Sequence, residues 1–380
     1  MENNNNLPVL SIETKKIKEV LNLCSMAVSK SPNDPYIIMH VRMSFDFKER
    51  LIYIQSTNFK QGLSTKISFD FKEDDVERNN FVCCVPHKEI SKIVSICSEE
   101  SFKVMFKDEN MLIKYGNSNH SIPVMIKESK DFPVWKKIAD DAPVILINDK
   151  ESEFCDFIKK ISTISTNLEI EDATCYVGIE CKDGMVSLSV TDKFILSVID
   201  FYFKCSKNFN TILIPKDAVN FIHKIFSGEL IKVIIGNEFI IVKSKEIEIF
   251  ILLSKTKPFD IIGMYEKISS RTGSYFSTTK ESLEESLKSV SIVNDICLLE
   301  NKKESIVLTT ENKEFKQKAN SKIDCDVSNF NEQFSFSINN FNKILNILKG
   351  PTVKITLNDT VVIVDDVENP NIKNLFGIMK

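Results

Sequence analysis

The side chains of this sequence most able to do chemistry are its histidines and its adjacent aspartate pairs. A DNA-modifying enzyme such as a nuclease needs carboxylates clustered on a metal ion or an activated nucleophile. The histidines are scattered and lack H-x-x-x-H or H-E-x-x-H spacing; they are His40, His87, His120 and His223. Aspartate pairs begin at Asp74, Asp140 and Asp365, but neighbours in a strand point to opposite faces, so such pairs are typical of solvated turns. We therefore expect no catalytic residues, metal or cofactor, with a nuclease as the alternative.

The ten cysteines form no C-x-x-C pair, and most lie within apolar patterns. A reduced thiol in such a pattern packs as a small hydrophobic side chain. We therefore expect structural thiols at every one of these positions: Cys24, Cys83, Cys84, Cys97, Cys155, Cys175, Cys181, Cys205, Cys297 and Cys325.

Composition indicates a folded protein with two or three domains. The chain has 380 residues, of which 43% are hydrophobic and 27% charged. The net charge of −4 argues against a protein that simply coats nucleic acid, although it leaves room for a local basic surface. Because no signal-peptide pattern or long apolar run is apparent, we expect a cytoplasmic protein.

A helix followed by two strands recurs three times along the chain, which is the signature of an internal repeat. The copies align on Pro86, Pro215 and Ser337, and positions 4, 7 and 11 further on are apolar in each. Seventeen residues after each start, a lysine opens a predicted hairpin, at Lys103, Lys232 and Lys354. Three copies at one spacing predict three related domains.

Each copy also begins with a longer amphipathic helix, expected at about residues 13–30, 149–166 and 279–293. Further strands lie between the two helices of each copy, for example at 51–55, 186–190 and 305–309. Helices and antiparallel strands in this order predict an α+β fold. The predicted domains are residues 1–138, 139–268 and 269–380.

Three tandem units of this kind resemble the bacterial DNA sliding clamp, the DNA polymerase III beta subunit family. Residues 81–88 look like the family's strand leading into a helix that starts at valine-proline. Asp131-Phe132-Pro133 is similar to its domain 1 end, and residues 190–197 to its threonine-aspartate turn in domain 2. The chain is therefore identified as a divergent member, and the match covers nearly all of it.

The resemblance implies a non-catalytic processivity factor with three clamp-type domains, each with two helices on antiparallel sheets. Two such chains would form a head-to-tail ring whose helices surround duplex DNA. Sequence-independent phosphate contacts suit a sliding ring, although lysines also populate any solvated helix face. The candidate DNA-facing residues are Lys15, Lys18, Lys30, Lys88, Lys92, Lys159, Lys160, Lys216, Lys224, Lys280, Lys288, Lys343 and Lys349.

In the family, polymerases, the clamp loader and repair proteins insert a peptide into an apolar cleft beside the C-terminus. The matching positions are Tyr176, Thr191, Phe194, Leu196, Pro258, Val362, Leu375, Phe376, Ile378 and Met379. Leu196 and Val362 could equally be core residues, whereas Phe376, Ile378 and Met379 favour a binding surface. Residues 193–195 and 375–380 depart from the family pattern. These departures suggest a clamp of a phage, a plasmid or a lineage with altered partner peptides.

For the dimer, the family pairs an edge strand of domain 1 with domain 3. The matching positions are His120 and Ile122 on one side, and Ile292 and Val293 on the other. Packing within the domain is an equal alternative for Ile292 and Val293. A non-ring scaffold that uses the same domains for protein contacts is the alternative function, and it would be a monomer that is not retained on DNA.

Overall fold

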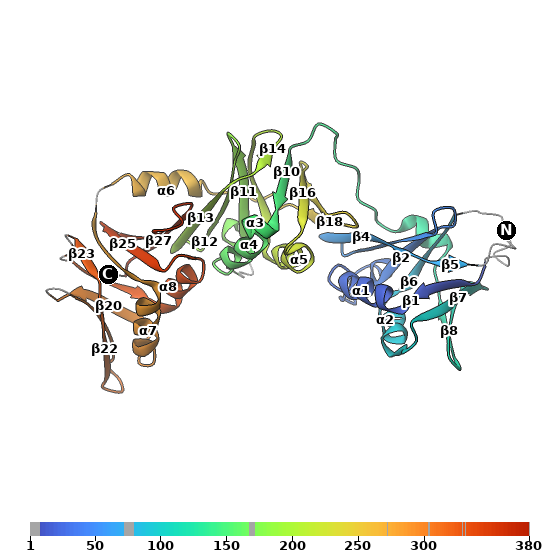
Figure 1. The fold of residues 1–380 in the computed structure, drawn as a ribbon, viewed down its shortest axis with the longest axis horizontal. Coiled ribbons are helices and arrows are strands. Elements are labelled where there is room, and N and C mark those ends of the chain that lie inside the picture. The colour runs from blue at the N-terminus through green and yellow to red at the C-terminus, as the bar shows by residue number, and fades with distance from the viewer. Residues whose placement is uncertain are drawn as a thin grey trace. The chain divides into compact units, whose positions relative to one another are not determined.

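The computed structural model describes residues 8–71, 80–166, 172–271, 273–302, 305–328, 330 and 332–379. Contacts within the chain divide it into two compact units. Figure 1 labels the helices and strands of both units. The first unit comprises Met1–Val144 and Leu230–Leu252, and the second comprises Ile145–Glu229 and Leu253–Lys380. Among the described residues, no helix combines the length and apolar character that a bilayer crossing requires.

The first unit holds a pair of helices and two antiparallel sheets. The helices are α1 (Thr14–Cys24) and α2 (His87–Ile96), with 3-10 turns at η2 (Tyr36–Met39) and η4 (Lys127–Asp131). One sheet has the order β5 (Asp70–Phe71), β1 (Leu10–Glu13), β7 (Ser101–Lys107), β8 (Asn110–Tyr115), β9 (Ser118–Pro123). The other runs through β16 (Leu230–Ile235), β17 (Phe239–Lys243), β18 (Ile247–Leu252), β4 (Gln61–Ser68), β3 (Leu51–Thr57), β2 (His40–Asp46) and β6 (Phe81–Pro86).

Alternation of side chains along these strands separates a buried face from an outer face. In β3, for example, Ile52 and Ile54 are buried whereas Tyr53 is exposed. The buried face packs on α1, whose Ile17 and Leu21 are also buried. The core of the first unit therefore lies between its helices and one face of its sheets.

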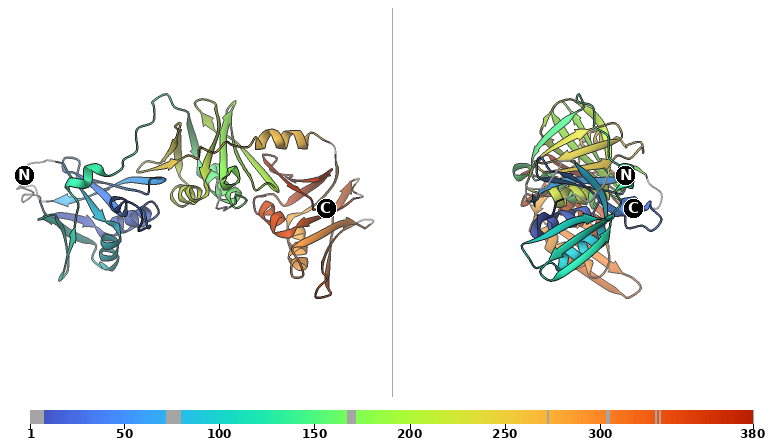
Figure 2. Two further views of the ribbon diagram at one scale, coloured as in Figure 1. Left: turned by 180° about the vertical axis from the view of Figure 1, so that it is seen from behind. Right: turned by 90° about the vertical axis from the view of Figure 1, so that its right-hand side faces the viewer.

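The second unit repeats this construction with more helices. They are α3 (Asp149–Ser152), α4 (Phe154–Ser162), α5 (Lys216–Phe226), α6 (Ile261–Ser269), α7 (Lys280–Ser291) and α8 (Ile338–Leu345), with a 3-10 turn η5 (Ala173–Cys175). The helices α4 and α5 contact one another, as do α7 and α8 (Figures 1 and 2). Two short strands, β10 (Val144–Asn148) and β14 (Lys204–Cys205), are paired at Ile145 and Cys205.

Two further antiparallel sheets complete the second unit. The larger has the order β15 (Phe209–Pro215), β11 (Tyr176–Lys182), β12 (Met185–Thr191), β13 (Ile195–Tyr202), β27 (Ile372–Gly377), β26 (Val361–Asp366), β25 (Thr352–Asn358), β19 (Ser274–Thr279), β23 (Asp326–Ser328). The smaller has the order β22 (Gln317–Ile323), β21 (Ile306–Asn312), β20 (Ile296–Asn301), β24 (Gln333–Ser337). The C-terminal strand β27 thus pairs with β13, which is far away in the sequence.

The three predicted hairpins are confirmed. Lys103, Lys232 and Lys354 each lie in the first strand of a hairpin, formed by β7 with β8, β16 with β17, and β25 with β26. The starts of α2, α5 and α8 follow Pro86, Pro215 and Ser337 directly. Local periodicity was sufficient here because each hairpin pairs neighbouring segments.

The first helix of the first two repeats is shorter or more interrupted than predicted. The amides of Met26 and Ala27 bond only three residues back, so α1 ends at Cys24 in a tight turn. In the middle repeat, Glu153 has φ of 51° and separates α3 from α4. The predicted range 279–293 corresponds to α7, which is close to the expected length.

The domain boundaries expected after residues 138 and 268 remain a prediction. Pairing of β18 with β4 places the hairpin strands β16 to β18 in the first unit, although the repeat assigns them to the middle copy. Contacts therefore divide the chain differently from the internal repeat.

Candidate functional site

Three of the candidate DNA-facing lysines each donate a hydrogen bond to a carbonyl group of the segment that follows the neighbouring helix. The ammonium of Lys18 donates to the Cys97 carbonyl at 2.8 Å, just beyond the end of α2. Lys216 donates in the same way to Ser165 at 3.1 Å, and Lys280 to Leu348 at 2.8 Å. Cys97 is the C-cap of α2, where carbonyl groups lack intrahelical partners, whereas Ser165 and Leu348 lie three residues beyond the last residues of α4 and α8. Sequence periodicity could not reveal these contacts because the partner carbonyls belong to segments far away in the chain.

Three more lysines make contacts within the second unit. Lys343 lies 3.6 Å from the Asp192 carboxylate, and Lys349 lies 2.5 Å from that of Glu153. The ammonium groups of Lys349 and Lys160 lie over the Phe157 ring, at 4.5 and 5.8 Å from its centroid. Lys343 and Lys349 therefore connect the segment around α8 to the β12–β13 turn and to α4.

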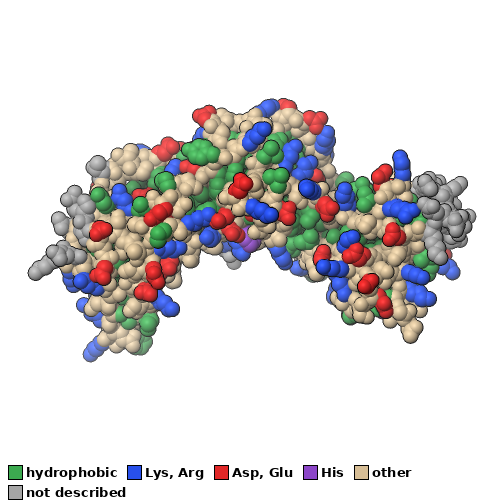
Figure 3. All heavy atoms as spheres, in the orientation of Figure 1, with side chains coloured by type: hydrophobic (Ala, Val, Ile, Leu, Met, Phe, Trp, Pro, Cys, Tyr) green, Lys and Arg blue, Asp and Glu red, His purple; other side chains and the backbone are tan. Residues whose placement is uncertain are grey.

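The remaining candidates project from helices or from the turn after α1 into solvent. They are Lys15, Lys30, Lys88, Lys92, Lys159, Lys224 and Lys288. On the face shown in Figure 3, lysine and arginine side chains alternate with aspartate and glutamate instead of forming one basic patch.

A tight turn between β12 and β13 projects one aromatic side chain outward. The Thr191 hydroxyl donates to the Ile195 carbonyl at 2.7 Å, and the Asp192 carboxylate accepts from the amides of Phe194 and Ile195 at 3.0 and 2.7 Å. Lys193 has φ of 78°, and its ammonium lies 2.7 Å from Asp172. The Phe194 side chain is 68% exposed, which is unusual for so large an apolar group.

Asp172 anchors this turn electrostatically. Its side chain accepts hydrogen bonds from Lys193 and from Thr174, and these lower the pKa of the carboxyl group to about 2. The pair remains largely exposed to solvent, so its role is to orient the turn more than to stabilise the fold.

The C-terminal segment lies directly beside this turn. The Gly377 amide donates to the Phe194 carbonyl at 2.9 Å, and the Met379 amide donates to the Ser335 carbonyl at 2.8 Å. Met379 is 41% exposed, and Ile378 is half-buried. Phe194, Ile378 and Met379 are the exposed or half-buried apolar residues of this turn and this segment, and we call them together the C-terminal surface.

The other predicted cleft residues divide between surface and core. Thr191 and Pro258 are half-buried. Leu196 and Leu375 are paired in β13 and β27, and they pack in one core cluster with Ile261 and Tyr265 of α6. Val362 is also fully buried, and Tyr176 packs with Ala173 and Leu213. The core therefore includes Leu196, Leu375, Val362 and Tyr176.

The expectation that Phe376 belongs to a binding surface is wrong. Its side chain is 3% exposed, with its ring centroid 5.2 Å from that of Phe341 and 5.9 Å from that of Phe336. Because side chains alternate along β27, Phe376 faces this aromatic cluster. The apolar C-terminus suggested a surface, but the pairing partners of β27 decide which of its side chains are exposed.

The predicted dimer residues lie on the edge strand β9 and at the end of α7. Strand β9 is one edge of its sheet, where the His120 Nε2 lies 3.0 Å from the Tyr115 hydroxyl. Ile122 is 1% exposed, so its side chain packs in its own core and only its backbone lies at the edge. The prediction of Ile122 as a side-chain anchor is corrected accordingly.

On the other side, Ile292 follows the last residue of α7 and is 84% exposed, whereas Val293 is half-buried. Strand β22 packs on α7 and forms an edge of the small sheet, with Lys318 and Lys322 exposed. The sequence did not single out β22, because an unpaired edge is recognised only once the strand order is known.

The described residues contain no group of three or more His, Cys, Asp or Glu side chains placed to hold a metal ion. All ten cysteines are free thiols, and most are buried. Burial raises the pKa of Cys24 and of Cys84 to about 12, so these thiols stay protonated at neutral pH.

No family model matches this chain, and no curated protein sequence is similar to it. Solved structures, in contrast, are similar over almost its whole length. The DNA polymerase sliding clamp of Pseudomonas aeruginosa matches with a TM-score of 0.85 and 14% identity, covering 98% of this chain and 100% of that chain. The beta clamp of Helicobacter pylori, solved with a DNA ligase peptide, matches with 0.84 and 17% over 98% and 100%.

The sliding clamp of Bacillus subtilis matches with a TM-score of 0.86 and 13% identity, covering 98% of this chain and 99% of that chain. The chain therefore has the α+β fold of the bacterial beta clamps, which confirms the predicted fold. At such low identity, the similarity establishes the fold alone.

Proposed function

We propose that this chain is a DNA sliding clamp: a non-catalytic ring that encircles duplex DNA in the cytoplasm and tethers replication proteins to it. The observation that carries the proposal is the clamp fold, which extends over 98% of the chain and the full length of the clamps it matches. A processivity factor needs no catalytic group, and its retention on DNA is topological.

Ring closure is proposed to join two different surfaces of two chains. Strand β9 carries no charged side chain, whereas β22 carries Lys318 and Lys322. Both strands lie at sheet edges, and unpaired edges are ready sites for strand addition. The exposed Ile292 lies beside β22 at the end of α7, the helix that packs on this strand, where it offers an apolar anchor. Joining unlike surfaces head to tail closes a ring only at the correct angle.

Once the ring is closed, the protein stays on DNA even when its affinity for the DNA backbone is low. The exposed lysines of the helices provide contacts that do not depend on base sequence, and an acidic net charge of −4 is compatible with them. Weak contacts also allow the ring to slide.

The C-terminal surface is proposed as the docking site for short partner peptides. Phe194 and Met379 supply exposed apolar area. Large apolar side chains of this kind are the usual anchors of peptide-binding sites. By analogy with the Helicobacter pylori clamp, which was solved with a DNA ligase peptide, the partners include ligases as well as polymerases and a clamp loader.

The decisive experiment combines solution mass with retention on DNA. Light scattering should give twice the chain mass of 43.4 kDa, and clamps loaded on nicked circular DNA should dissociate after linearisation. A concentration-independent mass of one chain, without retention on circular DNA, would refute the ring and leave the non-ring scaffold as the function.

A further inference from the structure

The segment between η4 and β10 lies across the outer face of the larger sheet of the first unit. We call residues 132–143 the connector. The Trp135 ring is stacked on Phe250, with centroids 5.7 Å apart, and its indole N–H donates to Glu248 at 3.0 Å. A Cβ atom on Gly62 would lie 2.8 Å from this ring, so the glycine allows the close approach. The Pro143 carbonyl accepts from the Ile235 amide at 2.9 Å.

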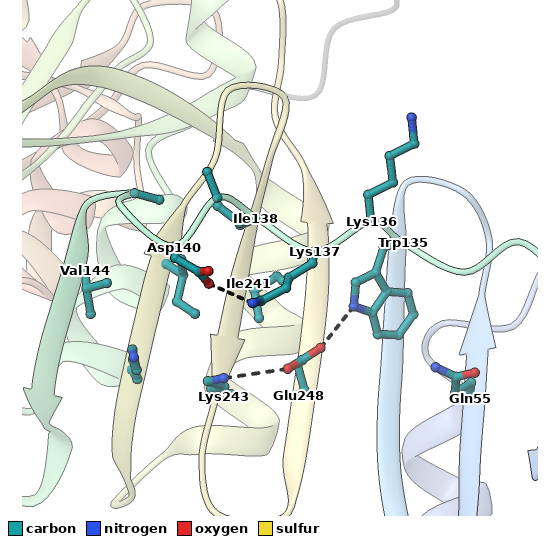
Figure 4. A pocket seen from close by; sticks show the side chains of 14 residues that line it. Gln55, Trp135, Lys136, Lys137, Ile138, Asp140, Val144, Ile241, Lys243 and Glu248 are labelled. Atoms are coloured by element: carbon teal, nitrogen blue, oxygen red, sulfur yellow. Dashed lines mark hydrogen bonds and ion pairs between the residues drawn. The ribbon is translucent and has the colours of Figure 1, made fainter.

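Between these two anchors, the connector and the strands enclose a cavity of about 490 Å³ (Figure 4). We call it the connector pocket. All its lining residues belong to the first unit. The volume falls within the range of about 300–1,000 Å³ that is usual for small-molecule sites. Ile138 from the connector, with Ile234 and Ile241 from the strands, forms its apolar wall.

The floor of the pocket is part of a polar row that crosses the sheet. In register, Lys232 lies opposite Lys243, and Lys243 lies opposite Glu248. The row continues through Ser64 and Gln55 to Arg42, whose guanidinium donates to Gln55 at 2.8 Å. All these side chains project from the outer face of the sheet. Four of them line the connector pocket: Lys232, Lys243, Glu248 and Gln55.

The negative charge near Lys232 and Lys243 does not offset the repulsion between these two lysines. Like charges directly opposite in a sheet repel one another. Glu248 lies 4.0 Å from the Lys243 ammonium and is shared with the Trp135 N–H. The Lys232 ammonium makes no ion pair or hydrogen bond with any of the described residues. Lys137 is paired with Asp140 above the strands, and Lys136 points away from them (Figure 4).

We propose that the connector pocket binds a small amphipathic anion. Its carboxylate or phosphate group lies between the Lys232 and Lys243 ammonium groups, and its apolar body packs against Ile138, Ile234 and Ile241. An anion between the two lysines relieves their repulsion, and the enclosing connector excludes water from the apolar part. This site is separate from the DNA-facing helices and from the C-terminal surface.

The test uses Trp135 as a local reporter, because it is the single tryptophan of the chain. The intact protein, without DNA, is titrated with octanoate, octyl phosphate, 1-octanol and inorganic phosphate, and tryptophan emission is recorded. We expect a saturable change with octanoate or octyl phosphate, and binding at least tenfold weaker for the neutral alcohol and for inorganic phosphate. Whichever of the two amphiphiles binds more tightly identifies the anionic group.

Two variants test the assignment to the lysine pair. The double variant Lys232→Gln/Lys243→Gln should weaken binding at least tenfold, whereas Lys245→Gln, which removes an exposed charge from the turn between β17 and β18 outside the pocket, should not. Thermal unfolding establishes that each variant is folded, and the single variant Lys232→Gln replaces the double variant if it is not. Equal binding of 1-octanol, unchanged binding by the lysine variants, or no saturable change overturns the proposal. Ring assembly does not enter this measurement.

Discussion

His40 illustrates how one buried side chain couples stability to pH. The residue is 1% exposed in β2, and its Nδ1 lies 2.9 Å from the Tyr36 carbonyl. Burial lowers the pKa of this imidazole, and it does the same for His87 of α2. The unfolded chain therefore binds these protons more readily than the folded chain.

The stability that depends on neutral His40 is present above the unfolded pKa of about 6.5 and is lost as pH falls through the lower folded pKa. We expect the urea concentration at the midpoint of unfolding to decrease when the pH is lowered from 7.5 to 5.5. The decrease should be smaller in His40→Asn. His223→Gln on α5 is the matched control. Identical pH dependence in His40→Asn and the wild type would contradict the assignment.

Phe194 is the residue on which the docking proposal depends most directly. Its side chain is 68% exposed, so truncation should not affect the core. We expect Phe194→Ala to weaken binding of clamp-binding peptides about 30-fold, which corresponds to the loss of ~2 kcal/mol typical of an interface anchor. Fluorescence polarisation with a labelled peptide measures the loss.

The control is Phe315→Ala, since Phe315 is 67% exposed in the turn between β21 and β22 and lies away from the C-terminal surface. Equal affinity of the Phe194 and Phe315 variants would place peptide docking elsewhere.

At the scale of elements, the pairing of β13 with β27 joins distant parts of the second unit. The Asp200 side chain is 6% exposed, and its carboxylate accepts from the Ser187 hydroxyl at 2.6 Å and from the Lys373 ammonium at 2.5 Å. The Asn371 side chain donates to the Asp200 carbonyl at 3.0 Å. This polar network fixes the register in which the C-terminal strand, and hence the C-terminal surface, is attached.

We expect Lys373→Met to destabilise the second unit because it leaves the Asp200 carboxylate buried without its cation. Breaking a buried pair costs ~3–5 kcal/mol, and the Lys373 side chain is 29% exposed, so the lower end applies. Urea unfolding and amide exchange in β27 measure the effect. Lys322→Met on the edge strand β22 is the control, and an equal free energy of unfolding for both variants would refute the role of the network.

At the scale of the whole molecule, the proposed ring depends on the edges β9 and β22 and on Ile292. We expect Ile292→Asp to shift the light-scattering mass from two chains toward one and to abolish retention on circular DNA, because a buried charge at the interface costs ~2 kcal/mol or more. Ile96→Asp is the matched control, since Ile96 also ends a helix and is 64% exposed. A dimer of unchanged affinity in Ile292→Asp would exclude this anchor.

The sequence by itself determined the repeated elements and the clamp fold. Apolar spacing after Pro86, Pro215 and Ser337 predicted three helices and the hairpins that follow them, because these structures depend on contacts between near neighbours in the chain.

Only the tertiary structure decided which of the predicted site residues are free to act. Lys18, Lys216 and Lys280 donate to carbonyls in the segments that follow other helices, and Phe376 packs on an aromatic cluster from β24 and α8. The connector pocket likewise depends on Trp135 reaching Gly62 and Phe250. The partners in each case lie far apart in the sequence, and local periodicity carries no information about contacts between distant segments.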